Sequence, residues 1–420
     1  MRNGEHLSTD PYKGVRDFYP EDMAVLRYIF DVWSETAESF GFERYDASIL
    51  EPSDLYKAKG AENEEMVNEQ TYTFTDRGGR EVTLRPEMTP TVARMIAAKK
   101  RELSFPVRWY SIPNLFRYER PQKGRLREHY QLNCDLFGID HIAADIEMIA
   151  LAHQMFLNFG ADESMFEIRI NDRREMLALY GSIGITDSSV IGDLTRLNDR
   201  RAKMPAEEYR KALTELVGDE HAAHVITLLD SQEDSGNEVI EGMRILGIGN
   251  ARIDRSLSRG FDYYTGTIFE IFDTSGENNR SLLGGGRYDN LTALFGDEAV
   301  TGIGFGMGDV TMRDFLETHD LLSFGITAPD LLIIPTDAAH FIEAERIGAA
   351  FRAADISCAV DLSQRKIGKM ISDAADRFVS YVLILGEDEI AQGSYTLKNL
   401  ETSEEISGTL EDLIGKFPSS

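Results

Sequence analysis

A run of charged side chains between Phe116 and Gln131 is the part of the sequence best suited to chemistry. Four arginines and one lysine fall within eleven positions there: Arg117, Arg120, Lys123, Arg125 and Arg127. A planar guanidinium suits bidentate contact with phosphate oxygens, and Glu119 could fix one of these arginines or bond an adenine amino group. The ends of the run alternate as half-buried strands do, whereas Pro121 and Gly124 favour a loop, so a hairpin with a cationic tip is predicted. A solvated, charge-rich hairpin without a ligand is the alternative that this run alone leaves open.

A second group of candidate residues lies more than a hundred positions further on. Tyr263 and Tyr264 follow an arginine and an aspartate in the run Arg259 to Gly266, just before a predicted strand over 267–272. Adjacent residues of a strand face opposite sides, so normally one tyrosine would pack and the other would be exposed. The arginine and the aspartate beside them, flanked by glycines, indicate a polar pocket instead. The glycine runs 284–286 and 302–308 follow, and alternating glycines in a strand let a flat ligand or another backbone approach closely. Neither run has the spacing of a dinucleotide-binding or P-loop motif.

Length and composition limit the kind of protein that carries these residues. A chain of 420 residues is expected to form two or three domains, and a net charge of -28 argues against diffuse adhesion to nucleic acid, so any such site must be local. The first twelve residues lack the apolar core of a signal peptide and no later run could span a bilayer, which predicts a cytoplasmic protein. Cys134 and Cys358, the only cysteines, support neither a disulfide framework nor a zinc site, and both are expected to be buried.

The hydrophobic pattern predicts the elements that position the candidate residues. A helix over 21–40 with apolar residues at helical spacing leads into a strand over 42–50; this helix could form a subunit contact or pack on its own sheet. A hairpin over 71–86 places Glu87 at a strand exit, and a helix begins at Thr89. Further elements are predicted as strands over 107–112, 115–118, 131–137 and 166–170 and as a helix over 145–159. Several consecutive antiparallel strands imply a sheet that is open on one face.

Two changes in composition and hydrophobic pattern divide the rest of the chain. Residues 172–250 are rich in helix formers and charges and have no strand of good length, which predicts a helical insertion. From residue 330 onward strands alternate with helices, which indicates a separate small α/β domain. Its strands are predicted over 330–335, 357–361, 380–385 and 395–400, and its helices over 338–354, 366–377 and 410–417.

Taken together, these residues resemble the histidyl-tRNA synthetase family of class II aminoacyl-tRNA synthetases over nearly the whole chain. The segments that carry the resemblance occur in the family's order: Lys13 to Phe18, Thr83 to Glu87, Phe116 to Gln131 and Arg259 to Thr265. The last is the most specific. The resemblance implies an α+β fold. Its catalytic domain over 1–325 would be built on an antiparallel sheet with flanking helices and a helical insertion at about 172–250. The resemblance also implies an anticodon-binding α/β domain over 330–420, and a homodimer through the helix and strand of 21–52.

The resemblance also implies a role for each candidate residue. The chain would join L-histidine to tRNA(His) through a histidyl-adenylate, with ATP and Mg²⁺, whose protein ligands the sequence does not identify. Arg259 and Arg117 would be catalytic at the α-phosphate. ATP would be bound by Arg117, Glu119, Arg125, Gly304, Gly306 and Gly308. Histidine would be bound by Glu87, Gln131, Asp135, Arg259, Tyr263, Tyr264 and Gly285. Gln122, Lys123 and Arg127 would meet the acceptor end of the tRNA.

One position departs from the family pattern. Class II enzymes usually carry an arginine after the last glycine run, to hold the terminal phosphate of ATP, and Thr311 stands where it aligns. Arg313 or Arg125 would then have to substitute, or ATP binding would weaken; Arg313 would face the same side in a strand but not in a helix. The departure keeps open an alternative, the noncatalytic regulatory subunit of ATP phosphoribosyltransferase. Such relatives generally lack the C-terminal domain and the histidine-reading segment, both of which this chain has.

Overall fold

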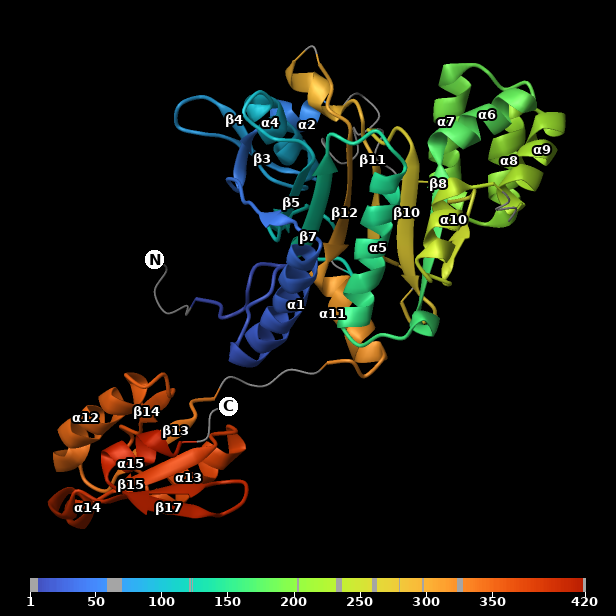
Figure 1. Cartoon of the computed structure of the whole chain (residues 1–420). Helices are drawn as coiled ribbons and strands as arrows, with labels where there is room; N and C mark the ends of the chain where they lie inside the picture. The colour runs from blue at the N-terminus through green and yellow to red at the C-terminus, as the bar shows by residue number, and fades with distance from the viewer. Residues whose placement is uncertain are drawn as a thin grey trace. The chain divides into compact units, whose positions relative to one another are not determined.

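The computed structural model describes residues 7–58, 70–120, 122, 124–201, 204–231, 236–258, 263–278, 280–296, 298–322 and 328–417. Two residues with predicted roles, Lys123 and Arg259, lie outside this described part of the chain. The chain divides into two compact units, one of residues 1–19 and 25–323 and the other of residues 20–24 and 324–420. The predicted α+β class is confirmed, since the larger unit is built on an antiparallel-rich sheet with flanking helices (Figure 1).

The larger unit contains a nine-stranded sheet. Along the sheet, the strands are β1 (Glu43–Arg44), β5 (Val107–Ser111), β7 (Glu128–Phe137), β12 (Gly302–Gly308), β11 (Ser281–Arg287), β10 (Thr267–Asp273), β8 (Phe166–Asp172) and β9 (Ala251–Ile253), with β6 (Asn114–Phe116) paired to β7. The pairs β1–β5 and β8–β9 are parallel, and the other pairs are antiparallel. The central strands β7 and β12 therefore lie side by side although they are far apart in the sequence.

The alternation of β12 decides which face of this sheet is packed. Its apolar residues Ile303, Phe305 and Met307 are buried, and the Trp33 indole on α1 (Pro20–Ser39) donates to the Met307 sulfur at 2.9 Å. This contact shows that α1 packs on its own sheet. Helices α5 (Ala143–Asn158) and α11 (Asp309–Thr318) cover the same face, where Phe156 contacts Phe315 at 5.3 Å between ring centroids (Figure 1). The intervening glycines consequently lie on the opposite face.

The larger unit also contains a smaller, three-stranded sheet formed by residues 50–84. It consists of β2 (Leu50–Pro52), β4 (Glu81–Leu84) and β3 (Tyr72–Thr75), flanked by α2 (Asp54–Lys57) and α4 (Thr89–Lys99). The hairpin over 71–86 is confirmed, but the continuous strand over 42–50 is wrong, because β1 joins the large sheet and β2 the small one. The buried Arg85 holds the chain between them, since its guanidinium donates to the Ala47 carbonyl at 2.8 Å.

The predicted helical insertion is confirmed. It contains α6 (Arg173–Ser182), α7 (Ser188–Asp199), α8 (Ala206–Val217), α9 (Asp219–Asp230) and α10 (Glu238–Ile245). Asp172, Asp187 and Asn237 cap three of these helices by accepting from first-turn amides. The first four helices share a core of their own that includes Leu194, Leu213 and Val225. Short β9 after the insertion was not predicted; it forms because the exposed edge of β8 offers a pairing partner.

The smaller unit has a five-stranded sheet in the order β14 (Cys358–Val360), β13 (Leu331–Pro335), β15 (Tyr381–Leu385), β16 (Tyr395–Asn399) and β17 (Glu405–Gly408). Its helices are α12 (Phe341–Arg352), α13 (Ile367–Asp376), α14 (Glu387–Gln392) and α15 (Leu410–Gly415). Leu331, Phe351 and Leu397 lie in its core. The expectation that both cysteines are buried is half wrong: Cys134 is buried in β7, whereas Cys358 is half-buried because β14 is an edge strand.

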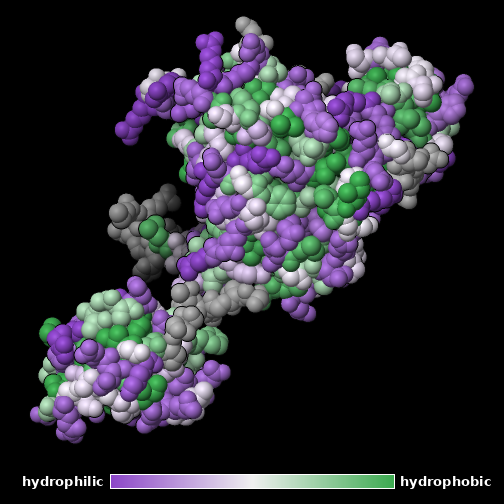
Figure 2. Space-filling model, in the orientation of Figure 1, coloured by the Kyte–Doolittle hydropathy of each residue, from purple (hydrophilic) through white to green (hydrophobic). Residues whose placement is uncertain are grey.

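The surface of both units mixes residue types. Hydrophilic and hydrophobic residues are interspersed over the visible face of each unit (Figure 2). No helix formed by the described residues is long and apolar enough to cross a membrane.

Candidate active site

Gly302, Gly304, Gly306 and Gly308 alternate along β12 and form a row, the glycine row, on one face of the large sheet. This row leaves room for other side chains on that face. Gly304 is paired with Asp135 on β7, and a Cβ at position 304 would lie 2.4 Å from the Asp135 Oδ1 atom and 2.6 Å from the Tyr288 hydroxyl. A Cβ at Gly306 would lie 2.8 Å from the Gln131 side-chain carbon. These separations are shorter than real Cβ contacts, so glycine is required for these polar side chains to lie flat over the strand.

Two carboxylates on this face are each held by a tyrosine. The Tyr263 hydroxyl donates to Glu87 Oε2 at 3.2 Å, and the Tyr288 hydroxyl donates to Asp135 Oδ1. Glu87 is 3% exposed and Asp135 is 3% exposed. The rings of Tyr263 and Tyr288 meet edge to face, with centroids 6.0 Å apart, and therefore link the two pairs. Buried carboxylates of this kind need a cationic or hydrogen-donating partner.

Asp135 retains an acceptor that no described residue uses. Its Oδ2 atom is buried and has no hydrogen-bond partner in the described part of the chain. Burial raises the pKa of Asp135 to about 7, although the hydrogen bond from Tyr288 acts in the opposite direction. A ligand that donates an N–H to Oδ2 would satisfy this acceptor and favour the charged carboxylate.

The hairpin that includes β6 and the start of β7 supplies cations next to these carboxylates. The Arg117 Nε atom donates to the Pro86 carbonyl at 2.8 Å, which places Arg117 beside the chain segment that carries Glu87. Arg125 pairs with Glu119 at 3.2 Å, where the Glu119 side chain is 10% exposed and that of Arg125 46%. The hairpin therefore carries one arginine beside the segment of Glu87 and a second arginine paired with Glu119.

Two further charged groups anchor this hairpin to α11. Buried Asp309 accepts from the Arg16 guanidinium at 2.7 Å and from the Tyr130 amide at 2.9 Å. Burial raises the pKa of Asp309 despite these partners. Burial, followed by the charges of Arg117 and Arg16, lowers the pKa of His129 to about 3, so His129 is neutral and adds no positive charge at neutral pH.

Comparison with known proteins identifies the family. The sequence profile described as Histidyl-tRNA synthetase matches residues 14–309, and that of an anticodon binding domain matches residues 330–419. The chain belongs to the histidyl-tRNA synthetase family. A histidine–tRNA ligase of Leptospira biflexa is 40% identical over 431 positions, covering 98% of each chain, and one of Thermoplasma volcanium is 36% identical, covering 97% of this chain and 98% of the other. The fold is similar to the crystal structure of histidyl-tRNA synthetase from Nostoc sp. PCC 7120, with a TM-score of 0.79 at 22% identity over 98% of this chain and 99% of that one.

Asp135 and Gln131 lie over the glycine row, whereas three other described residues with predicted roles lie elsewhere or are engaged within the chain. Gly285 pairs with Phe269 and Phe305, and a side chain there would meet their side chains on the helix-covered face. Arg127 donates to the Glu119 carbonyl and the Tyr12 hydroxyl and stacks on the Tyr118 ring, so its guanidinium is occupied within the chain. Gln122 is exposed at the hairpin tip, where it bridges to Arg125.

Tyr264 packs against Gly286 of β11, which is paired with Gly304 of β12. Its side chain is 6% exposed, and a Cβ at Gly286 would lie 2.8 Å from its Cδ1 atom. Its carbonyl accepts from Arg173 at 3.0 Å, at the start of α6. Tyr264 therefore packs on the sheet, while its neighbour Tyr263 reaches Glu87; the predicted role of both tyrosines in histidine binding stays a prediction.

The structure shows where Thr311 and Arg313 lie, the residues that concern the departure from the family pattern. Thr311 lies in the first turn of α11, and its hydroxyl donates to the Gly308 carbonyl at 3.2 Å. Arg313 lies in the same helix and pairs with Glu317 at 2.8 Å. Of the two cations that the sequence left open, Arg313 therefore faces another side than position 311, because a helix directs residues two positions apart to different sides.

Tyr288 is a site residue that sequence reasoning missed. It follows Arg287 and the glycine run 284–286. The glycines indicate a close approach to the backbone, but they indicate nothing about the side chain of Tyr288. Buried Arg287 donates to Asp145 on α5 at 3.2 Å and so fixes the end of β11 that carries Tyr288. The signal that could have revealed Tyr288 is an aromatic hydroxyl directly after a strand that lines the site.

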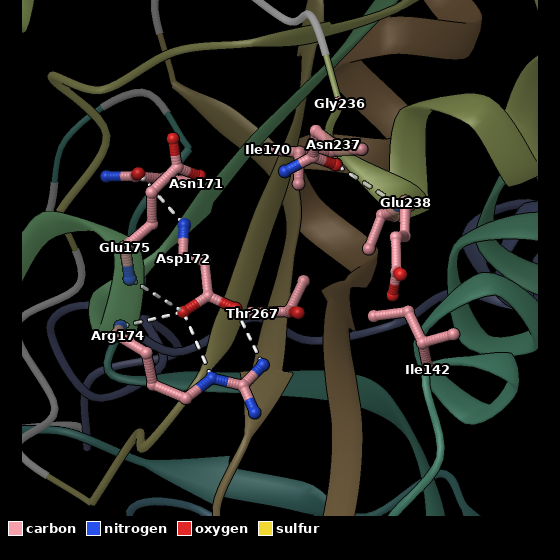
Figure 3. A pocket seen from close by; sticks show the side chains of 11 residues that line it. Ile142, Ile170, Asn171, Asp172, Arg174, Glu175, Gly236, Asn237, Glu238 and Thr267 are labelled. Atoms are coloured by element: carbon pink, nitrogen blue, oxygen red, sulfur yellow. Dashed lines mark hydrogen bonds and ion pairs between the residues drawn. The ribbon is translucent and has the colours of Figure 1, made fainter. Parts of the chain in front are cut away.

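A separate cavity of about 300 Å³ lies where the helical insertion joins the sheet. Its lining includes Asp172, Arg174, Asn237 and Thr267, and Figure 3 shows the Arg174 guanidinium turned toward the Asp172 carboxylate, which it contacts at 2.7 Å. None of the residues with a predicted catalytic or binding role lines this cavity. This cavity is therefore separate from the residues described above.

Proposed function

We propose that this chain is a histidine–tRNA ligase, which activates L-histidine with ATP to histidyl-adenylate and transfers the histidyl group to the 3′ end of tRNA(His). The observation that carries the proposal is the pair of buried, tyrosine-held carboxylates on one face, Glu87 and Asp135. Histidine has two groups that such carboxylates recognise, its α-ammonium and its imidazole N–H. Curated relatives that are 36% and 40% identical over nearly the full length are histidine–tRNA ligases.

In this proposal each carboxylate reads one end of histidine. Glu87 pairs with the ammonium, and the open Oδ2 atom of Asp135 accepts from the imidazole N–H. Gln131, which lies over Gly306, contacts the substrate between them. An amino acid without an imidazole would leave the Asp135 oxygen buried and without a hydrogen-bond donor. The free-energy cost of this unsatisfied acceptor is a strong basis for selecting histidine over other amino acids.

The nucleotide would lie toward the hairpin. Its adenine amino group would bond Glu119, and its phosphates would meet Arg117 and Arg125. The histidine carboxylate then attacks the α-phosphorus and pyrophosphate leaves, so charge grows on oxygens that preplaced guanidinium groups stabilise. No covalent intermediate on the protein is needed. Arg259, which lies outside the described residues, is proposed to act on the α-phosphate opposite Arg117.

Magnesium belongs to the proposal only as a companion of ATP. Among the described residues, no group of three or more His, Cys, Asp or Glu side chains could hold a metal ion. Mg²⁺ is commonly held by substrate phosphates with one or two carboxylates, so it would enter the site together with the triphosphate.

The domain assignments and partners complete the proposal. Residues 1–325 would form the catalytic domain and residues 330–420 the anticodon-binding domain, supported by the matching family profiles. Class II membership, a homodimer and a cytoplasmic location are proposed on the family resemblance. A noncatalytic regulatory subunit is not favoured, because the chain matches an anticodon-binding profile and aligns with ligases from end to end.

The proposal is tested by amino-acid-dependent exchange between ATP and pyrophosphate. Exchange should require histidine among the twenty amino acids, and Asp135→Ala should abolish it, while Asp140→Ala, an exposed position nearby in the sequence, should not. A folded wild-type chain that binds histidine without supporting exchange would contradict the ligase and favour the regulatory subunit.

A further inference from the structure

An arginine from outside the hairpin, Arg280, lies against the hairpin turn, in a segment that no motif marks. Arg280 is a half-buried residue immediately before β11. A Cβ on Gly124, at the hairpin turn, would lie 3.0 Å from the Arg280 Cδ atom and 3.5 Å from the Thr311 methyl group. The turn of the hairpin, the start of β11 and the first turn of α11 therefore meet at one point.

The charge at this point is not balanced within the described part of the chain. No hydrogen bond or ion pair joins the Arg280 side chain to another described residue, whereas Arg125 already pairs with Glu119. Arg280 is close enough to both for their charges to act on it. Burial, followed by the charge of Arg125, lowers the pKa of Arg280, and Glu119 acts in the opposite direction. Two guanidinium groups thus share one carboxylate, in a protein whose net charge is -28.

Such an arrangement is costly unless an anion completes it. Like charges in a partly buried place repel, and an unpaired guanidinium loses part of its hydration. A polyphosphate would remove both costs, because its oxygens accept from several planar donors at once. Thr311 cannot supply this contact, since its side chain carries no charge and its hydroxyl already donates to a main-chain carbonyl.

We propose that Arg280 holds the outer phosphates of ATP and supplies the cation that position 311 lacks. This inference rests on the proposed function. Arg117 lies beside the segment of Glu87, where the amino acid and the α-phosphate must meet. Arg280 and Arg125 lie at the turn of the hairpin, where the β- and γ-phosphates would extend. Arg280 is thus a specificity residue for the triphosphate and does not touch the amino acid.

The test compares the wild type with Arg280→Ala, Arg280→Gln and Arg280→Lys. Arg280→Ala and Arg280→Gln should raise the KM for ATP, and that for pyrophosphate in the reverse direction, by roughly 10- to 100-fold, the loss expected for one charge-assisted contact. The KM for histidine should stay unchanged, and so should the inhibition constant of AMP, which has no outer phosphates. Arg280→Lys, which keeps the charge, should fall between the wild type and Arg280→Ala.

Two controls separate this role from a structural one. Arg313→Ala removes a guanidinium from the same helix as Thr311, where Arg313 pairs with Glu317, and should leave the KM for ATP unchanged. Transfer of histidine from preformed adenylate to tRNA involves no outer phosphate and should proceed at the wild-type rate in Arg280→Ala.

Three results would overturn the inference. An unchanged KM for ATP in Arg280→Ala and Arg280→Gln would show that Arg280 does not bind the triphosphate, while the proposed function would stand on the wild-type activity. An equal loss of ATP, AMP and histidine binding, together with a lower melting temperature, would show that Arg280 is structural. A wild-type chain that forms no histidyl-adenylate would remove the proposed function and this inference together.

Discussion

At the scale of single residues, Asp135 couples recognition to stability. Its pKa of about 7 in the folded chain lies above the value of about 3.9 expected when the chain is unfolded. The folded chain therefore holds this proton more tightly, and the stability that the protonated carboxyl contributes is fully present below about pH 3.9 and is lost as the pH rises through about 7. Asparagine does not ionise and can still accept from Tyr288. We expect Asp135→Asn without ligand to gain on the order of 2 kcal/mol relative to the wild type between pH 5 and pH 8.

Urea unfolding of both proteins at the two pH values measures this change. Asp140→Asn is the matched control, because Asp140 is exposed and the same substitution there should leave the pH dependence nearly unchanged. A constant difference in unfolding free energy between wild type and Asp135→Asn across this range would mean that Asp135 is charged throughout. The same variant should bind histidine more weakly at pH 8, since a neutral amide replaces the carboxylate.

At the scale of elements, the glycine row of β12 is a packing requirement. A Cβ at Gly304 would also lie 2.7 Å from the Cys134 carbonyl, a main-chain atom that cannot rotate away. Gly304→Ala should therefore lower the free energy of unfolding by about 1–3 kcal/mol and abolish histidine-dependent exchange. The matched change is Gly368→Ala in α13, where nothing lies within 4 Å and helix propensity predicts a gain of roughly 0.5–1 kcal/mol. Thermal unfolding and exchange assays of the two variants check this. Full activity in Gly304→Ala would show that the neighbouring atoms can move to accommodate a Cβ.

The same scale shows what the sequence could and could not predict. The hairpin over 71–86 and the strand β13 follow from local alternation and turn residues, so they were predictable. The break between β1 and β2 was not, because it depends on Arg85, whose guanidinium binds a carbonyl 38 positions earlier. Tyr288 and Arg280 were missed for a related reason. Their roles depend on strand register and on a loop reaching a hairpin turn, and neither leaves a local pattern in the sequence.

At the scale of the whole molecule, the division into two units predicts separable steps. The smaller unit has its own core, which includes Leu331, Ile333 and Leu383, and none of the residues proposed to bind ATP or histidine belongs to it. A chain that ends at Leu322 should therefore retain histidine-dependent exchange within a few-fold of the full chain. Its kcat/KM for tRNA should fall by roughly 100-fold or more, because each 1.4 kcal/mol of lost anticodon binding costs a factor of ten.

The two assays together decide how the units share the reaction. Circular dichroism of the truncated chain first establishes that its large sheet and helices are intact. If a folded, truncated chain loses exchange as well, adenylate formation depends on residues after 322. If it keeps its full kcat/KM for tRNA, recognition of tRNA lies in the larger unit, where the hairpin tip and the helical insertion are the surfaces to examine next. With a net charge of -28 repelling the polyanion as a whole, recognition must come from such local contacts and from base stacking.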